Sequence, residues 1–277
     1  MLLAMLGCMM SLLNISMLLP ALSFFILGAI VGSFLNVVIL RFKTGRSIVH
    51  GRSVCFSCGK KLSAHELVPM LSYLVLRGKC SACKSRIAPQ YALVEFTTGI
   101  AFAYLFFRFG LSLAFLLYAT MACYLIIMFV YDLRHKIIPD SWSYAFAALA
   151  LGTLFLQYGT QIFTLGMTDF SAGLVLFLFF WMFWFVSGGR WMGLGDAKLA
   201  LGIGWLLGLS SGIFATVVAF WSGAFVSVAT LALMRLHVAR GHLTMKSEIP
   251  FAPFIIFGAI LAFVSGWNFI DILNLFS

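Results

Sequence analysis

Long uninterrupted apolar runs constrain this chain more than any other feature. Most of them approach about 20 residues, the length that a helix needs to cross the hydrocarbon of a bilayer. The sequence therefore predicts an all-α polytopic membrane protein with about eight transmembrane helices. The expected spans are residues 17–40, 91–108, 112–131, 141–158, 169–187, 196–210, 212–235 and 252–275.

The charged residues follow the connections between these runs. Only 9% of the chain is charged, against about 25% in a typical soluble domain. The net charge of +10 could suggest nucleic acid, but 17 of the 18 Lys and Arg residues lie in 41–90, 132–140, 188–198 and 235–250. Positive loops stay in the cytoplasm, so we expect both termini outside, membrane lipid as a partner and no nucleic acid.

The apolar stretch before residue 41 is too long for one span. Pro20 divides it, and no Lys or Arg precedes Arg41, so the basic region of a secretory signal is missing. We expect residues 1–16 to form an interfacial lead-in and 17–40 the first transmembrane helix. Two alternatives stay open: residues 1–16 span as well, or Met17 is the true start. Residues 41–90 would form a cytoplasmic domain, and 91–277 the transmembrane core.

Residues 41–90 hold two Cys-x-x-Cys pairs, Cys55 with Cys58 and Cys80 with Cys83. Two such pairs can complete a tetrahedral, structural Zn²⁺ site, although their separation slightly exceeds the usual range. A metal would stabilise a domain too small for a large core. Disulfides are the competing interpretation, which a reducing cytoplasm disfavours. The pattern of segment 62–74, between the pairs, predicts a helix that lies on the membrane face. The alternative is a hairpin that separates the two metal knuckles.

Two of the chain's eight acids lie at the ends of apolar runs. Asp132 closes the run 112–131, where an acid meets the unfavourable end of the helix dipole. Asp196 follows a glycine-rich bend, Gly193-Leu194-Gly195, and begins the next run. An acid near hydrocarbon is a functional candidate by default. We expect these two to meet at the cytoplasmic ends of their helices as an aspartic-protease dyad that shares one proton.

Simpler roles compete for the same residues. Asp140 or Ser141 would cap the helix that follows Pro139, and Asp196 could be a cap as well. Lys198 cannot pair with Asp196, because positions two apart on a helix do not face each other. His135 reads as a solvated loop residue, and Glu66 as an exposed acid.

Two other function classes remain. A proton-coupled transporter would use the acids as a relay near the midplane, but these acids lie at span ends and no internal repeat is evident. A non-catalytic scaffold carrying a zinc module would need neither aspartate.

Several stretches together resemble one family, the prepilin leader peptidases, which are intramembrane aspartic proteases with a Gly-x-Gly-Asp motif. They occur in the family's order and cover nearly the whole chain from Gly28. The stretches are Gly32–Ile39 with Arg41, both cysteine pairs, Leu93-Val94-Glu95 with Thr98-Gly99, Asp132 with Ile138-Pro139-Asp140, Gly193–Leu199 and Pro250–Phe254.

The resemblance implies that Asp132 and Asp196 are catalytic, with Gly193, Gly195, Lys198, Pro139 and Asp140 supporting the site. It implies a bacterial inner-membrane enzyme whose four-cysteine domain and active site face the cytoplasm. The expected substrates are precursors of type IV pilins or type II secretion pseudopilins, which lose a short basic leader. Many members then N-methylate the new N-terminal residue, usually Phe, with S-adenosylmethionine.

The chain also departs from the family pattern. Arg134 stands where many members carry an acid, Ala252 replaces a usual glycine and Ala92 a frequent proline. These differences affect substrate contacts more than the chemistry. Because the loops are basic, acids must receive a basic leader, and we expect Glu66, Glu95 and Glu248, together with Asp140, to do so.

Overall fold

The computed structural model describes residues 15–45, 47–164, 166–236 and 250–276. Within them all the regular elements are helices, accompanied by two isolated β-bridges. The chain divides into two compact units, residues 1–127 and 128–277, with the division inside helix α5 (Leu113–His135). Residues 1–14 of the expected lead-in and Glu248 lie outside the described residues. The all-α prediction is confirmed.

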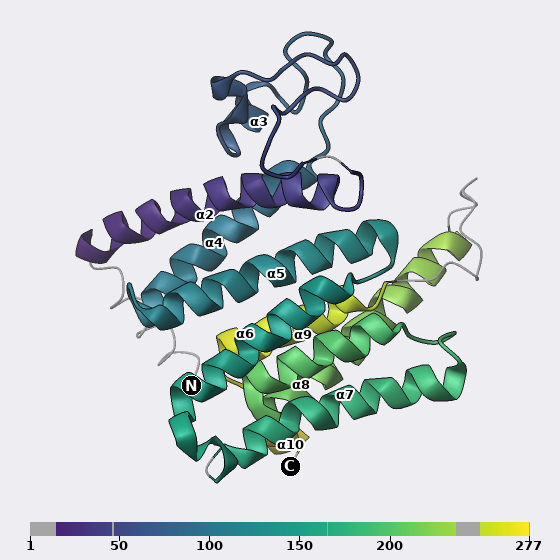
Figure 1. The fold of residues 1–277 in the computed structure, drawn as a ribbon. Helices are drawn as coiled ribbons and strands as arrows, with labels where there is room; N and C mark the ends of the chain where they lie inside the picture. The colour runs from purple at the N-terminus through teal and green to yellow at the C-terminus, as the bar shows by residue number, and fades with distance from the viewer. Residues whose placement is uncertain (1–14, 46, 165, 237–249, 277) are drawn as a thin grey trace. The chain divides into compact units, whose positions relative to one another are not determined.

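The first unit contains two long apolar helices that pack against each other (Figure 1), α2 (Ile15–Arg41) and α4 (Gln90–Phe109). A Cβ atom on Gly32 would lie 2.8 Å from the Cα atom of Glu95, so only glycine allows this approach. Farther along, the rings of Phe24 and Phe106 stack with centroids 4.1 Å apart. Pro20 lies inside α2 and does not divide the helix.

Residues 42–89 connect α2 to α4 and carry the four cysteines. Each cysteine pair forms a knuckle closed by one β-bridge, Val54 with Lys61 and Lys79 with Arg86. The hydrogen bonds repeat as well: the N–H of Cys55 donates to Lys60 O, and the N–H of Cys80 donates to Ser85 O, both at 2.9 Å. The knuckles are therefore a small internal repeat that the sequence reading did not detect.

Of the two expectations for residues 62–74, the hairpin is wrong; the segment is helical, and its contact with the membrane face stays a prediction. The segment forms two short helices, η1 (Ala64–Leu67) and α3 (Leu71–Val75), between the knuckles. Leu71, Leu74 and Val75 are exposed.

The second unit is built around α8 (Leu194–Leu236), which packs most extensively against three other helices (Figure 1). These are α6 (Asp140–Tyr158), α7 (Met167–Ser187) and α9 (Ala252–Ser265). The short helices η2 (Gly159–Phe163) and α10 (Phe269–Phe276) complete the unit.

Three of the expected spans differ from the structure. Runs 196–210 and 212–235 belong to one element, α8, with a kink at Gly208, whose φ of 75° suits glycine. Run 252–275 was expected as one helix, but α9 ends at Ser265, and Gly266 takes the left-handed conformation before α10. In the described residues, six helices are long and apolar enough to cross a membrane, the shorter α9 is also apolar, and the protein is multi-pass.

Candidate active site and metal centre

Asp132 and Asp196 both belong to the second unit and lie close enough to interact electrostatically. Asp132 is in the last turn of α5, and Asp196 is in the first turn of α8. Their side chains are buried, with residue exposures of 4% and 7%. Two acids far apart in the sequence thus lie near each other in the fold.

Backbone amides contact both carboxylates. The amide of Ala252 interacts with Asp132, and the amide of Gly193 interacts with Asp196. Within the described part of the chain, Oδ2 of Asp132 is buried and has no hydrogen-bond partner. An acceptor left open in this way can bind a water molecule or a proton.

The bend before α8 packs against the connection between α5 and α6. A Cβ atom on Gly195 would lie 3.0 Å from Cβ of Ile138, so a larger residue would push this loop away. Next to it, the ring of Tyr131 packs edge-on against Trp142, with centroids 5.1 Å apart. The glycine therefore sets how closely the two aspartate-bearing segments approach.

Asp140 does not cap α6, contrary to the expectation. The N-cap is Pro139, which has no side chain able to accept a hydrogen bond, and Asp140 is the first helical residue. Its Oδ1 lies 2.7 Å from Nζ of Lys198, which also sits 5.2 Å above the ring of Tyr144. Because Asp140 and Tyr144 are four apart, they share a face of α6 and receive Lys198 together. The prediction that Lys198 does not pair with Asp196 agrees with this arrangement.

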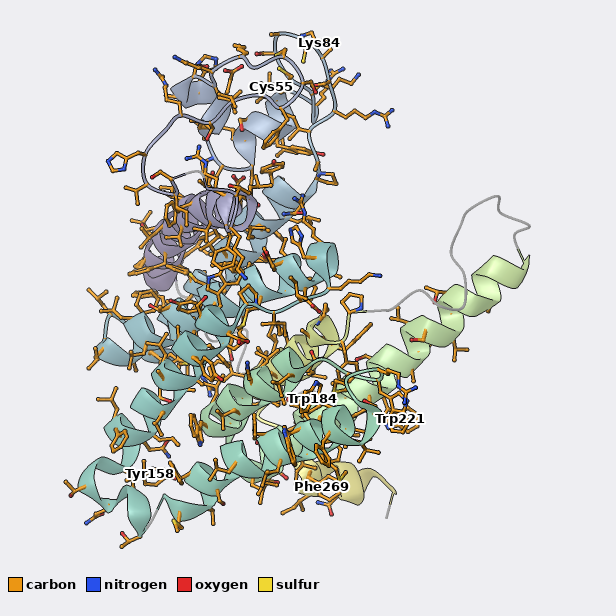
Figure 2. All side chains as sticks on the ribbon, turned by 45° about the vertical axis from the view of Figure 1, so that its right-hand side comes forward. Cys55, Lys84, Tyr158, Trp184, Trp221 and Phe269 are labelled. Carbon is orange, nitrogen blue, oxygen red and sulfur yellow. The ribbon has the colours of Figure 1, made fainter. Side chains whose placement is uncertain are left out.

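The four cysteines Cys55, Cys58, Cys80 and Cys83 form one cluster. Their sulfur atoms all lie within 4.8 Å of one another. Sγ of Cys55 is 3.8 Å from Sγ of Cys83, which matches the separation of about 3.8 Å between thiolates bound tetrahedrally at about 2.3 Å from zinc. The cysteines are free and not joined in disulfides. Figure 2 shows Cys55 among the loops of the domain and Lys84 at its outer edge. The residues present therefore fit a Zn²⁺ ion.

Hydrogen bonds favour the thiolate form of two of the four cysteines, Cys55 and Cys83. Backbone N–H groups of Cys58 and Ser57 lower the pKa of Cys55 to about 6. The Ser85 hydroxyl lowers the pKa of Cys83. Both effects favour the deprotonated sulfur that a metal requires.

Glu66 is buried inside the four-cysteine domain, so the expectation of an exposed acid is wrong. It accepts hydrogen bonds from the Ser63 N–H at 2.9 Å and from Lys60 Nζ at 2.9 Å. The hydroxyl groups of Ser63 and Ser81 donate to it as well. These bonds, led by that of the Ser63 hydroxyl, lower the pKa of Glu66. Glu66 thus ties the first knuckle to the second.

Glu95 is also buried, in the first unit. Its Oε2 accepts a hydrogen bond from the N–H of Met70 at 2.7 Å. The sequence reading did not single out the nearby polar residues Ser33 and Asn36 as site residues. The sequence could have indicated them, because two polar residues three positions apart in an apolar helix share one helix face.

Comparison with known protein families covers most of the chain in two parts. The model described as "Bacterial Peptidase A24 N-terminal domain" matches residues 26–109. The model described as "Type IV leader peptidase family" matches residues 119–228. The first match contains the four cysteines, and the second contains both Asp132 and Asp196.

Three curated proteins illustrate the similarity, and each bears the name "Prepilin leader peptidase/N-methyltransferase". The protein from Bacillus subtilis (strain 168) is 33% identical, with 89% of this chain and 95% of the relative aligned. The protein from Pseudomonas putida is 29% identical, with 87% of this chain and 89% of the relative aligned. The protein from Burkholderia pseudomallei (strain 1026b) is 30% identical, with 88% of this chain and 85% of the relative aligned. The search of solved structures found no match.

Proposed function

The chain belongs to the prepilin leader peptidase/N-methyltransferase family, and we propose that it cleaves the basic leader from type IV prepilins or type II secretion pseudopilins. Cleavage would occur at the cytoplasmic face of the bacterial inner membrane. In the same proposal the enzyme methylates the new N-terminal residue. The residues 41–90 would act as a domain on the cytoplasmic side, and the helices from 91 onward would carry the peptidase chemistry.

The observation that carries the peptidase proposal is the interaction of the buried Asp132 and Asp196 carboxylates. In the described residues, neither forms an ion pair with a cation, since Lys198 pairs with Asp140. Two like charges held close share one proton. One carboxylate can then take a proton from the attacking water, while the protonated partner polarises the scissile carbonyl.

The surrounding residues would hold the pair in position. Gly195 keeps the bend close to Ile138, and the Asp140–Lys198 pair joins the start of α6 to the first turn of α8. The open Oδ2 of Asp132 is where we place the reacting water or the shared proton. After attack, the proton held by the pair passes to the leaving amine, which completes hydrolysis.

Two further groups complete the proposal. A structural Zn²⁺ would bind Cys55, Cys58, Cys80 and Cys83, leaving no coordination position for catalysis. S-adenosylmethionine would supply the methyl group for the second reaction, for which the relatives' names give the support.

The test is to change Asp132→Asn and Asp196→Asn separately in the full-length enzyme. Each change keeps the shape and removes one proton-transfer group, so cleavage of a prepilin should fall by about 10²–10⁴-fold. Asp271→Asn is the control, because Asp271 accepts a hydrogen bond from the N–H of Asn268 beside α10. A folded Asp132 or Asp196 variant that cleaves at the normal rate would overturn the mechanism.

A further inference from the structure

The first unit contains a cavity of about 730 Å³ between the end of α2, the start of α4 and the four-cysteine domain. Its volume lies within the range of about 300–1,000 Å³ that is usual for small-molecule sites. Apolar side chains form much of its wall, among them Val37, Leu40, Leu76 and Ile87. The cavity therefore has the size and character of a binding site, and nothing in the peptidase mechanism uses it.

Three polar residues from two apolar helices meet in this wall. Ser33 and Asn36 come from α2, and Glu95 comes from α4. The Ser33 side chain interacts with the Glu95 carboxylate. The amide nitrogen of Asn36 donates to the carbonyl oxygen of Tyr91 at 3.1 Å, one helical turn before Glu95. We call Ser33, Asn36 and Glu95 the acceptor cluster.

The cluster has more acceptors than donors. Asn36 is only 2% exposed, and its Oδ1 has no hydrogen-bond partner in the described residues. Glu95 forms no ion pair there, whereas the other carboxylate of the cavity wall, Glu66, is paired with Lys60. The Met70 N–H and the Ser33 side chain donate to Glu95 but leave its negative charge without a cation, and the Asn36 oxygen has no donor; both are costly in a buried site. A primary ammonium group, with three donors and one positive charge, meets this requirement.

The position of the cluster distinguishes between possible ammonium ligands. Ser33 and Glu95 lie on helices long and apolar enough to span the membrane. A membrane-bound peptide could therefore present its N-terminus to them. The arginines of the cavity wall, Arg41 and Arg86, come from the end of α2 and from the second knuckle. A free amino acid would need such a cation for its carboxylate, but Arg41 already donates to the carbonyl oxygens of Ser47, His50 and Arg52. A peptide N-terminus carries no carboxylate and needs no such partner.

We propose that the acceptor cluster binds the α-ammonium group of the processed peptide, with Glu95 as the base for its methylation. This rests on the proposed methyltransferase function. Glu95 takes one proton from the ammonium group, which leaves a neutral amine with a free electron pair. The amine nitrogen forms a bond to the methyl carbon of a sulfonium donor while the carbon–sulfur bond breaks. That bond's electron pair remains on sulfur, and the positive charge passes to nitrogen.

Direct binding to the full-length enzyme tests the assignment without turnover. The probe is a labelled peptide with the mature N-terminal sequence, compared with the same peptide N-acetylated, which has no ammonium group. The wild type should bind the free-amine peptide at least about tenfold more tightly, as expected for a charge-assisted hydrogen bond. Glu95→Gln keeps the shape of the side chain and should lose this preference, whereas Glu95→Asp should retain part of it.

Thr97→Val is the matched control on α4, because the Thr97 hydroxyl bonds its own helix at Leu93 O. It should keep the wild-type preference. If Glu95→Gln also keeps the preference, the proposal is wrong. If instead Glu95→Gln weakens binding of S-adenosylmethionine alone and the peptide preference is unchanged, the cluster holds the donor and the proposal is equally wrong.

Two activity assays separate this proposal from the proposed function. In Glu95→Gln, methyl transfer to the free-amine peptide should fall at least about 100-fold, and by much more than prepilin cleavage, in which Glu95 was expected to receive the basic leader. Cleavage and methyl transfer that fall together would refute a role confined to methylation. If the wild type itself transfers no methyl group, the proposed methyltransferase function fails, whatever the binding preference shows.

Discussion

The ammonium nitrogen of Lys198 lies 2.7 Å from Oδ1 of Asp140, and not beside Asp196, which precedes it by two positions on the same helix. The side chain of Lys198 is 11% exposed and that of Asp140 is 63% exposed, so a mostly buried cation reaches a carboxylate at the edge of the protein. The ion pair joins the first turn of α8 to the first turn of α6. It also leaves Asp196 free to interact with Asp132.

Asp140→Asn should destabilise the second unit, because it leaves a mostly buried ammonium group without its counter-ion. The loss should be about 1 kcal/mol, at the low end for a charged hydrogen bond since Asp140 is open to solvent. Denaturant unfolding in detergent would measure it. Lys198→Met combined with Asp140→Asn removes the unpaired charge and should cost less than the sum of the single changes. Strictly additive losses would show that the pair contributes nothing.

Gly195→Ala should slow prepilin cleavage by about tenfold or more, because a displacement of about 1 Å at a catalytic site can cost as much as 100-fold. The new methyl group would lie 3.0 Å from Cβ of Ile138 and push the two segments apart. Steady-state cleavage rates would measure the effect. Adding Ile138→Gly removes the Cβ atom that the new methyl group meets and should restore part of the rate. The idea fails if the double variant is as slow as Gly195→Ala and both are folded.

Removing the metal should unfold the four-cysteine domain and leave the membrane helices intact. A structural zinc site contributes folding energy directly, because the unfolded segment has no preformed site. Metal analysis should find one zinc per chain in the wild type and much less in Cys58→Ser. Hydrogen exchange in residues 53–87 should become fast while the helical signal persists. Cys123→Ser, in α5, is the control and should retain the zinc; equal zinc in both variants would contradict the four-cysteine site.

Glu66→Gln should lower the stability of the four-cysteine domain at pH 7, since Lys60 and two serine hydroxyls lose a charged partner. The folded pKa of Glu66 is lowered, so its stabilisation is complete above the unfolded pKa of about 4.3 and is lost as the pH falls below it. Hydrogen exchange of both proteins at equal zinc saturation would measure the difference. That difference should narrow as the pH falls below about 4.3. If the difference in stability between the wild type and Glu66→Gln grows as the pH falls, the folded pKa of Glu66 is not lowered and the prediction is wrong.

The apolar runs were enough to predict most helices, because hydrophobic length is a local property. The run 17–40 corresponds to α2, and 169–187 to α7. Local reasoning failed where backbone geometry decided the outcome. Gly208 bends α8 without ending it, and Gly266 ends α9 before the apolar run is over.

Single residues were harder to interpret than helices. Asp140 looked like a cap because a polar residue after Pro139 often is one, but its partner is Lys198, far away in the sequence. Glu66 looked exposed because most glutamates are. It is buried because three partners from separate turns of the domain surround it. Asn36 was not predicted as a site residue, because only the folded structure shows that it lines the cavity and that its Oδ1 has no hydrogen-bond partner in the described residues.

The sequence by itself determined that this protein spans a membrane with helices, that two cysteine pairs could share a metal, and that two acids stand at helix ends. These properties depend on the hydrophobicity, spacing and chemistry of neighbouring residues. The tertiary structure decided which charges are paired: Lys198 with Asp140, Lys60 with Glu66, and Asp132 near Asp196. It also decided that Glu95 lines a cavity and, within the described residues, forms no ion pair there. Pairing of charges depends on distances across the fold, and no local pattern in the chain encodes those distances.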